Sequence, residues 1–558
     1  MLVGIDVGGT FTDGVLYHEG EIIKTAKQPT VTAKLQDSIL QVLDELLAGI
    51  NEAEIKRVVL STTLVTNLLA AGQEEQVALV LIPGPGLNLR RLQLFPATFI
   101  LKGAIDFRGR IIEPLVQTEI AEVAAKIKAQ GYRQAAVVGK FSSRNHQHEE
   151  QVAQILQEKI PYLRIVKGHK VSGQLNFLRR LVTAYYTAAT KTHWAVFARE
   201  IESALQKRGI KCPLQILKAD GGTMPLPVSL EFPCETVFSG PAASVMGAFA
   251  LTRDRQTSVV VDIGGTTSDL ALILAGEPLH ASRGARINGR YSSVRAFAVR
   301  SIPLGGDSAV RRSGTEITLG PDRLGPAACF GGPAATPTDA VNLLTGGKLG
   351  NLARSRAALA EVGQKAKMTA EEVAQTVINI FLGRLEGSIA EMFLAWEQEP
   401  AYRIWELVNK KKVTPERVIG IGAAAEAFVP ALAKRLAAQS FVHPYSPVAN
   451  ALGAAVARPT LSLLLHADTR RQVYDLNVEG ITGTIGAHAQ MTDVKDLAVQ
   501  HLQEIARQRG IGRYADRYEF FLEEQFNMVR GWSTTGKLFD VGIQIAPGVI
   551  DEFKGVLS

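Results

Sequence analysis

Cysteine is scarce in this chain, and its scarcity narrows the chemistry that the chain can perform. The three cysteines among 558 residues lie far apart, at Cys212, Cys234 and Cys329. They are too few and too widely spaced to build a disulfide framework or the paired ligands of a Cys-based metal site. A reducing compartment suits such a chain, and we expect a cytoplasmic protein.

Long apolar runs are missing as well. No stretch approaches the roughly 18 uncharged apolar residues that would indicate a membrane-spanning helix. The first residues, 1–6, enter a strand pattern at once and include Asp6, without the basic region and apolar core of a signal peptide. We therefore expect no membrane association.

Neither sign of charge dominates. The chain has 61 basic and 54 acidic residues, a net charge of +7, spread along its whole length. This mild excess favours anionic ligands such as nucleotides or carboxylates, and it does not favour nucleic acid. Between Arg283 and Arg312, however, seven arginines accompany a single acid, Asp307. Two interpretations stay open for this stretch: the solvated face of a hairpin, or a clamp for phosphate or substrate.

Several catalytic motifs are absent. The sequence has no Gly-x-Ser-x-Gly elbow and no His-Glu-x-x-His pair, and Gly347-Lys348-Leu349 places leucine where a P-loop needs Ser or Thr. The histidines and acids of residues 146–150 lack the spacing of a zinc helix and predict only the start of a helix. Hydrolases of the serine-triad or zinc type and P-loop NTPases are thereby disfavoured.

A repeated motif is the clearest signal in the chain. Residues 5–13 and 261–269 both contain Asp-Val/Ile-Gly-Gly-Thr-x-Thr/Ser-Asp, at a constant offset of 256 residues. An apolar strand precedes and follows each copy, which predicts a hairpin with a tight glycine turn. The chain is therefore expected to contain two related lobes.

The residue types of the repeat fit phosphate and metal chemistry. Paired glycines lack the Cβ atoms that would keep backbone N–H groups away from phosphate oxygens, and nearby hydroxyls add neutral donors. Asp6 and Asp262 end their strands where a carboxylate can hold hydrated Mg²⁺ or orient a water molecule. The predicted phosphate-binding residues of the two turns are Gly8, Gly9, Thr10, Thr12, Gly264, Gly265, Thr266 and Thr267.

The remaining patterns predict an α/β chain in three parts. Thr369 and Glu372 form a capping box that opens a helix to about Trp396, and residues 417–425 read as a strand, a glycine turn and a helix. The small residues of 450–456 suit a closely packed helix at a hinge. We predict an N-terminal lobe at 1–175, a second lobe at 176–464, and an appended α+β domain at 465–558.

The order of motifs resembles the hydantoinase/oxoprolinase family, over residues 1 to about 460. The resemblance rests on the two hairpins together with segments 220–222, 239–243, 304–308 and 336–340. It implies a place in the acetate kinase, actin, hexokinase and sugar kinase superfamily. The implied fold is α/β, with two related actin/hexokinase-like (ribonuclease H-like) lobes around a nucleotide cleft.

The resemblance also implies an activity. ATP would phosphorylate the oxygen of a cyclic amide of the hydantoin or 5-oxoproline type, and water would then open the activated ring. Asp6 and Asp262 would hold Mg²⁺ and position water, Asp13 and Asp269 would support the turns, and a second, separately encoded subunit would share the work. Gly305, Gly306 and Gly422 fall on ligand-binding segments of the family.

The sequence departs from the family pattern at two places. Asp307 stands where the family usually has a third glycine, which places a carboxylate near the phosphates as a candidate catalytic group. Residues 422–425 read Gly-Ala-Ala-Ala in place of the usual Gly-Gly-Ala-Gly-Pro of the adenosine segment. Both departures leave the substrate class open.

Three other functions share these motifs. An ATPase that remodels a partner such as a corrinoid protein would hydrolyse ATP only with that partner. A subunit of an ATP-dependent carboxylase of the acetone carboxylase kind would need bicarbonate and a ketone. A small-molecule kinase would release a stable phosphorylated product.

Overall fold

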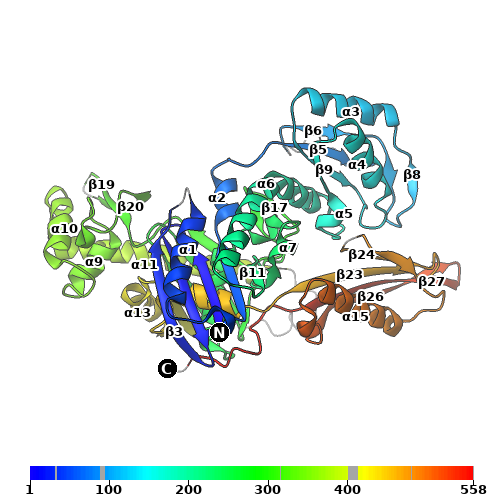
Figure 1. Cartoon of the computed structure of the whole chain (residues 1–558). Coiled ribbons are helices and arrows are strands. Elements are labelled where there is room, and N and C mark those ends of the chain that lie inside the picture. Colours follow the sequence, from blue (N-terminus) through cyan, green and yellow to red (C-terminus); the bar gives the residue numbers. More distant parts are fainter. Residues whose placement is uncertain are drawn as a thin grey trace.

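The computed structural model describes residues 1–31, 34–87, 89, 95–314, 316–399, 413–478 and 480–556. Over these residues the chain is a mixed α/β protein in which several sheets are each covered by helices (Figure 1). Among them, none of the helices combines the length and the apolar character that crossing a bilayer requires.

The first repeat lies in a six-stranded sheet. Its order is β12-β11-β4-β1-β2-β3. β1 and β2 form the predicted hairpin, β3 continues it antiparallel, and β4 and β11 run parallel to β1. The strands are β1 (Leu2–Val7), β2 (Phe11–His18), β3 (Glu21–Pro29), β4 (Arg57–Thr62), β11 (Leu214–Leu217) and β12 (Thr223–Pro225).

The second repeat lies in a sheet with the same connectivity. Its order is β15-β14-β13-β21-β22, with β18 also pairing with β14. β13 and β14 form the second hairpin, and β21 and β22 run parallel to β13. The strands are β13 (Ser258–Ile263), β14 (Ser268–Leu274), β15 (Glu277–Pro278), β18 (Val299–Ile302), β21 (Arg417–Ile421) and β22 (Gln439–Val442). The repeat seen in nine residues of sequence therefore extends to the topology of two whole sheets.

A separate unit is inserted between β4 and β11. Its parallel sheet has the order β10-β9-β5-β6 and its own apolar core. Its elements are β5 (Val77–Ile82), β6 (Thr98–Ile100), α3 (Gln117–Ala129), β9 (Gln134–Gly139), α4 (Gln147–Lys159) and β10 (Arg164–Lys167). α4 begins after His146, as the sequence predicted. β11 and β12 lie in the same sheet as β1, although the sequence analysis placed the end of the first lobe at residue 175.

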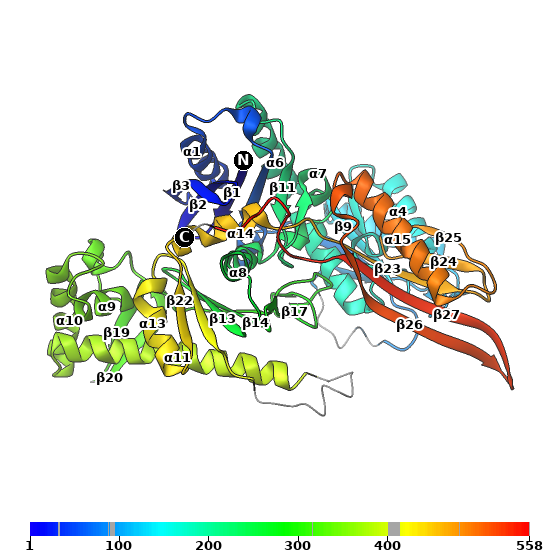
Figure 2. The same ribbon diagram turned by 90° about the horizontal axis from the view of Figure 1, so that it is seen from below.

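The C-terminal part forms a five-stranded antiparallel sheet with a helix on one face. Its sheet has the order β25-β24-β23-β27-β26, and α15 (Met491–Gln508) covers one face with Val494, Ala498 and Leu502 buried. The strands are β23 (Leu461–Asp468), β24 (Val473–Leu476), β25 (Thr482–Thr484), β26 (Tyr518–Arg530) and β27 (Ser533–Ile545). β26 and β27 project as a long hairpin, seen clearly in Figure 2. The tail then returns to the first sheet, where the Tyr17 hydroxyl donates to the Gly555 carbonyl over 2.9 Å.

Two helices made of small residues lie between the two repeat sheets (Figure 2). They are α8 (Ser239–Thr252) and α14 (Ala449–Val456). A Cβ atom on Gly453 would lie 2.3 Å from the Gly247 nitrogen, and one on Gly4 of β1 would lie 2.0 Å from the Ala451 carbonyl oxygen. Glycine at these positions therefore allows α14 to contact α8 and the first sheet at once.

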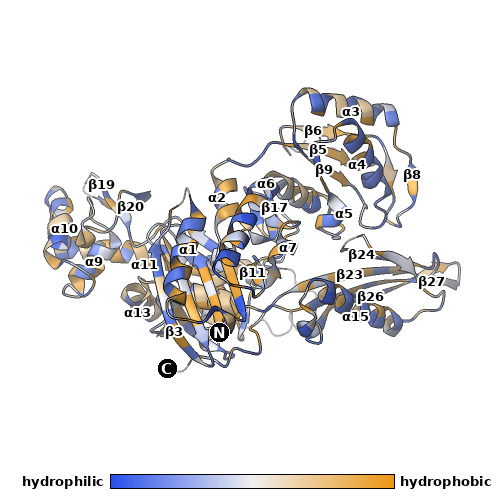
Figure 3. Cartoon of the chain, in the orientation of Figure 1, coloured by the Kyte–Doolittle hydropathy of each residue, from blue (hydrophilic) through white to orange (hydrophobic). Residues whose placement is uncertain are grey.

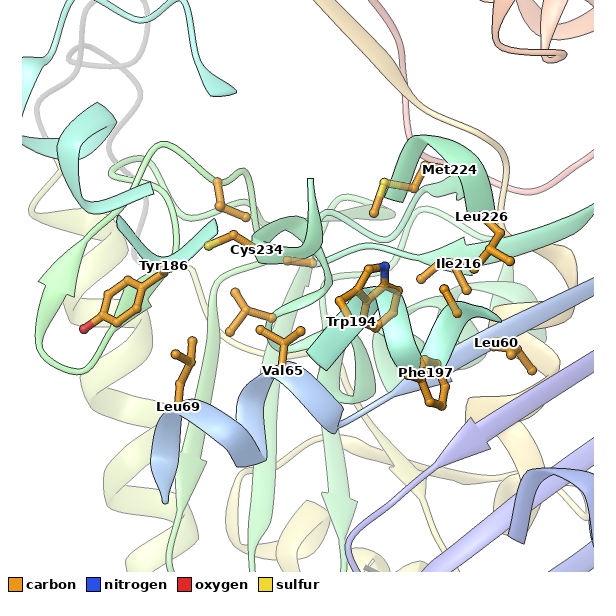
Figure 4. Close-up of a cluster of buried hydrophobic side chains, with 14 of the residues drawn as sticks. Leu60, Val65, Leu69, Tyr186, Trp194, Phe197, Ile216, Met224, Leu226 and Cys234 are labelled. Atoms are coloured by element: carbon orange, nitrogen blue, oxygen red, sulfur yellow. The ribbon is translucent and has the colours of Figure 1, made fainter. Parts of the chain in front are cut away.

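The central strands β1 and β4 are buried along their whole length, and hydrophobic residues, orange in Figure 3, run through the sheets. Trp194 of α6 (Phe177–Lys207) is fully buried in a cluster beside the first sheet (Figure 4), and its indole N–H donates to Ser229 Oγ over 2.9 Å. Farther along the chain, Thr369 and Glu372 form the capping box of α11 (Ala370–Glu397). The sequence predicted this helix and its first turn.

Candidate functional site

Each hairpin places two aspartates opposite each other at its turn. Asp6 pairs in register with Asp13, and Asp262 with Asp269. The turns are closed by equivalent hydrogen bonds, from Gly8 N–H to the Phe11 carbonyl over 3.0 Å and from Gly264 N–H to the Thr267 carbonyl over 2.9 Å. The two copies of the motif therefore have the same local structure.

The two hairpins meet at one side chain. Asn450, on α14, donates its amide nitrogen to Asp6 Oδ2 over 3.3 Å and to Asp262 Oδ2 over 3.2 Å. Ser244, on α8, donates to Asp262 Oδ2 over 2.6 Å. The structure thus brings together the two carboxylates that the sequence predicted as metal ligands, from strands 256 residues apart.

Burial and mutual repulsion make these carboxylates reluctant to ionise. Burial, with the charges of Asp13 and Asp262, raises the pKa of Asp6 to about 7. Burial, with the charge of Asp262, raises the pKa of Asp269 to about 7 as well. The pKa values of Asp13 and Asp262 are also raised by burial. A cation placed among these groups would relieve the repulsion and restore the charged forms.

The donor set fits a magnesium ion that binds together with phosphates. Asp6 Oδ1 and Asp269 Oδ1 are buried and have no hydrogen-bond partner within the described part of the chain. That part also contains no group of three His, Cys, Asp or Glu side chains arranged around a metal position. Mg²⁺ in nucleotide sites is usually held by only one or two carboxylates, with waters and phosphate oxygens completing its shell. Asp6 and Asp262 would supply those carboxylates.

The first glycine turn is open to a ligand. A Cβ atom built on Gly9 would meet no atom within 4 Å, so nothing in the chain itself requires glycine there. Thr10 beside it is half-buried. Thr12, in contrast, is fully buried and its hydroxyl contacts the Thr30 hydroxyl at 3.0 Å. Gly9 and Thr10 thus lie on the open side of the turn. Gly8 closes the turn through its N–H, and Thr12 ties β2 to the end of β3.

The second turn is supported by the loop that contains Asp307. Gly306 N–H donates to the Gly264 carbonyl and Asp307 N–H to the Gly265 carbonyl, each over 2.9 Å. The Asp307 carboxylate pairs with Arg323, with Oδ2 2.9 Å from the guanidinium. Burial raises the pKa of Asp307, and Arg323 opposes that effect. The carboxylate that departs from the family pattern is therefore charge-balanced by an arginine that the sequence analysis did not single out.

Other predicted positions surround this turn. A Cβ atom on Gly305 would lie 2.5 Å from the Gly265 carbonyl oxygen, so a side chain has no room there. Thr266 is exposed and Thr267 is half-buried. Gly422, at the end of β21, has φ +86°, and its Cβ would lie 2.9 Å from Asp262 Oδ1. The predicted adenosine segment thus begins directly beside the aspartate pair.

Arg323, Lys27 and Asn450 escaped the sequence analysis. Lys27 of β3 lies opposite Asp13, with its ammonium 2.5 Å from Asp13 Oδ1 and 4.9 Å from the centre of the Phe11 ring. Asn450 lies on a helix whose small residues gave only a packing signal. The register of β2 with β3 would have identified Lys27, but strand register is not readable from one sequence.

The other sequence candidates lie elsewhere. Ser239 contacts the end of β4, because its hydroxyl donates a hydrogen bond to the Thr62 carbonyl. Asp220 pairs with Lys218 beyond β11. The seven arginines of the 283–312 stretch contact several groups: Arg300 contacts Glu391, Arg311 Asp322, Arg295 Gln544, Arg312 the Gly314 carbonyl, Arg290 the ring of Phe95, and both Arg283 and Arg286 the ring of Tyr291. They do not converge on one ligand.

Comparison with known proteins gives several relatives. The chain is 25% identical over 428 residues to an uncharacterised protein of Methanocaldococcus jannaschii, covering 68% of this chain and 62% of that protein. It is 26% identical to the acetophenone carboxylase gamma subunit of Aromatoleum aromaticum, over 61% of this chain and 52% of the relative. It is 24% identical to the caprolactamase subunit alpha of Pseudomonas jessenii, over 60% and 53%. The chain thus spans half to three fifths of the length of these relatives.

Two solved structures share the fold. A nucleotide-free acetone carboxylase superposes with a TM-score of 0.70 at 17% identity, covering 99% of this chain and 88% of the other. The ATP-dependent caprolactamase of Pseudomonas jessenii gives a TM-score of 0.70 at 18% identity, covering 97% and 87%. Residues 180–462 match the hydantoinase/oxoprolinase family, and residues 2–160 match the N-terminal region of the same family. The chain therefore belongs to the hydantoinase/oxoprolinase family.

Proposed function

We propose that this chain is an ATP-dependent hydrolase of cyclic amides that works as one subunit of a complex. One observation carries the proposal: a single amide, that of Asn450, joins the strand-end aspartates of two glycine hairpins. The two turns would then bind one polyphosphate from opposite sides, as in the actin and hexokinase superfamily, to which we assign the two lobes.

The chain's own groups have distinct roles in this proposal. The N–H groups of Gly9 and Gly265 would bind phosphate oxygens, because those of Gly8 and Gly264 already close their turns. Asp6 and Asp262 would hold Mg²⁺, which neutralises charge on the phosphates and so favours attack at the γ-phosphorus. Lys27 would add a positive charge beside Asp13. Gly422 would leave room for the nucleoside next to Asp262.

The chemistry follows from the inertness of an amide. Its carbonyl is a poor electrophile, so the amide oxygen would attack the γ-phosphorus and the bond to the ADP oxygen would break. The phosphorylated oxygen is then a good leaving group. Water adds to the ring carbon, and the ring nitrogen leaves with a proton, so the C–N bond breaks and an acyl phosphate forms. A second water then hydrolyses the acyl phosphate to a carboxylate and phosphate. The net reaction consumes one ATP and two waters for each ring opened.

A second function is favoured by the relatives. Two of them are carboxylase subunits, from acetophenone carboxylase and acetone carboxylase. Carboxylation would use the same ATP site to activate an oxygen of bicarbonate or of a ketone. The two functions therefore differ in the second substrate and share the nucleotide chemistry.

Measuring ATP turnover with a panel of substrates distinguishes the hydrolase function from the carboxylase function. ATP turnover by the purified chain, alone and with a co-purifying subunit, is measured with hydantoin, with 5-oxoproline, and with acetone plus bicarbonate. Stimulation by a cyclic amide supports the first function, and stimulation only by ketone plus bicarbonate supports the second. Asp262→Asn should abolish turnover in every arm while the fold is kept. Normal turnover in Asp262→Asn would refute the metal assignment.

A further inference from the structure

The two glycine turns differ in what stands over them. Gly9 of the first turn is exposed, and a Cβ atom built on it would meet no atom within 4 Å. Its counterpart in the second turn, Gly265, is half-buried, and its Cβ would lie 2.7 Å from Asp307 Oδ2 and 3.7 Å from Arg323 Nε. An ion pair therefore covers one turn of the duplicated motif, whereas the other turn is open.

Strand pairing places this ion pair beside the turn. Asp307 N–H donates to the Gly265 carbonyl over 2.9 Å, which holds the backbone of Asp307 against the second hairpin. β19 (Ser308–Ser313) begins with the next residue, and its first position pairs in register with Arg323, which ends β20 (Glu316–Arg323; Figure 1). The sheet itself therefore brings Arg323 to the second turn.

Arg323 has hydrogen-bond donors to spare. Its Nε and Nη2 both donate to a single oxygen, Asp307 Oδ2, over 3.1 Å and 2.9 Å. Within the residues that the structure describes, no second acceptor contacts this guanidinium, and 31% of its side chain is exposed. Because a guanidinium presents a fork of several N–H groups, some of them remain for an acceptor that enters from solvent.

A phosphate is the acceptor that this position favours. In the proposed function, the N–H group of Gly265 binds a phosphate oxygen, and Arg323 lies directly beside that residue. Bonds from arginine to phosphate are charge-assisted and match the geometry of the fork. Asp307 alone would repel the same phosphate, because both groups are negative. Arg323 can contact both anions at once, with one side of its fork on Asp307 and the other on the phosphate.

We propose that Arg323 binds a phosphate oxygen of the nucleotide at the second turn, and that Asp307 orients Arg323 for this contact. The assignment rests on the proposed function, because it needs a nucleotide between the two hairpins. It gives Asp307 a positioning role in place of the catalytic role expected from the sequence. It also gives the two turns unequal tasks, since only the second has a charged pair over it.

Single variants should change the affinity for Mg-ATP in opposite directions. Arg323→Met removes the donors and leaves Asp307 uncompensated, so the Kd measured by calorimetry should rise at least about 10-fold. Asp307→Asn keeps an acceptor for Arg323 but removes the negative charge. Its Kd should fall about 5-fold, as expected for one unit charge about 4 Å away in water-like surroundings. An ion pair that only braced the fold would raise the Kd in both variants or in neither, and either result would overturn the proposal.

A double variant tests whether Arg323 contacts the phosphate or only neutralises Asp307. In the Asp307→Asn background, Arg323→Met should still weaken Mg-ATP binding at least about 10-fold, because the phosphate contact is lost there too. No further loss in the double variant would contradict the contact. Arg323→Lys keeps the charge without the fork, so its Kd should lie between those of wild type and Arg323→Met. This variant also keeps the test decisive if the methionine variant does not fold.

Arg311→Met is the matched control. Arg311 lies on β19 of the same hairpin and pairs with Asp322 at 2.8 Å, where both side chains are about half exposed. The variant removes the same charge from the same hairpin and should bind Mg-ATP as wild type does. If wild type binds Mg-ATP and Arg323→Met binds it equally well, this inference is refuted and the nucleotide site stands. If wild type itself does not bind Mg-ATP, the nucleotide site is refuted and this inference with it.

Discussion

At the scale of residues, the site depends on one amide shared by two acids. Asn450 is a neutral donor between Asp6 and Asp262, and it stabilises two charges that burial otherwise disfavours. The glycine motif predicted both aspartates because motif and strand end are local features. Asn450 and Lys27 were missed because their roles come from contacts between distant segments.

Replacing Asn450 tests this arrangement. Asn450→Ala removes the donor and should lower ATP turnover at least about 10-fold, since hydrogen bonds to charged groups are worth about 1.5–3 kcal/mol. Steady-state ATP hydrolysis measures the effect. Asn379→Ala, at an exposed position on α11, is the control and should behave as wild type. Wild-type turnover in Asn450→Ala would show that the amide does not position the aspartates.

At the scale of elements, three glycines allow the close helix contacts through which the two repeat sheets are joined. α14 contacts both α8 and β1 only because Gly4, Gly247 and Gly453 lack side chains. The sequence predicted the hairpins, the capped helix α11 and a close-packed helix at 450–456, since these follow from local periodicity and caps. It did not reveal that β11 and β12 return to the first sheet, because pairing of distant strands leaves no local pattern.

Adding one methyl group at the helix contact tests that packing. Gly453→Ala would place Cβ 2.3 Å from the Gly247 nitrogen, so α14 must shift and carry Asn450 with it. We expect a loss of about 1–3 kcal/mol in the free energy of unfolding, together with a raised KM for ATP.

Thr369→Ala is the comparison for this variant. It removes the α11 cap at a cost of about 1 kcal/mol and should leave the KM for ATP unchanged. If the two variants had the same effect on KM, the helix contact would not be linked to the site.

At the scale of the whole molecule, the inserted unit and the C-terminal sheet are joined by half-buried charged side chains. Arg144 contacts Asp540 at 3.1 Å and Asp475 at 3.7 Å, and His466 contacts Asp540 at 2.8 Å. The sequence predicted a separate α+β segment after residue 464. It could not predict this interface, because the charges that form it come from two units and each reads locally as an ordinary surface residue.

This interface predicts a pH dependence. Burial raises the pKa of Asp475 from 3.8 to about 6, despite Arg144 and His466. The folded state therefore holds the proton more tightly than the unfolded state, so the contribution is complete below pH 3.8 and is lost as pH rises through 6. The loss is on the order of 3 kcal/mol.

Asp475→Asn stays neutral at every pH and escapes this loss. Its melting temperature relative to wild type should therefore be more favourable at pH 8 than at pH 5, measured by thermal denaturation. Asp496→Asn, at an exposed position on α15, should show no such trend. A difference that is the same at both pH values would exclude a raised pKa at Asp475.

The most direct measurement of the central claim is calorimetric binding of Mg-ATP to Gly9→Val. No atom lies within 4 Å of a Cβ at Gly9, so the variant should fold and melt as wild type does. If the turn cradles phosphates, the added side chain occupies their place, and affinity should fall at least about 10-fold. Gly387→Val, also unobstructed but on α11, should bind as wild type. Wild-type affinity in Gly9→Val would contradict a polyphosphate held between the two hairpins.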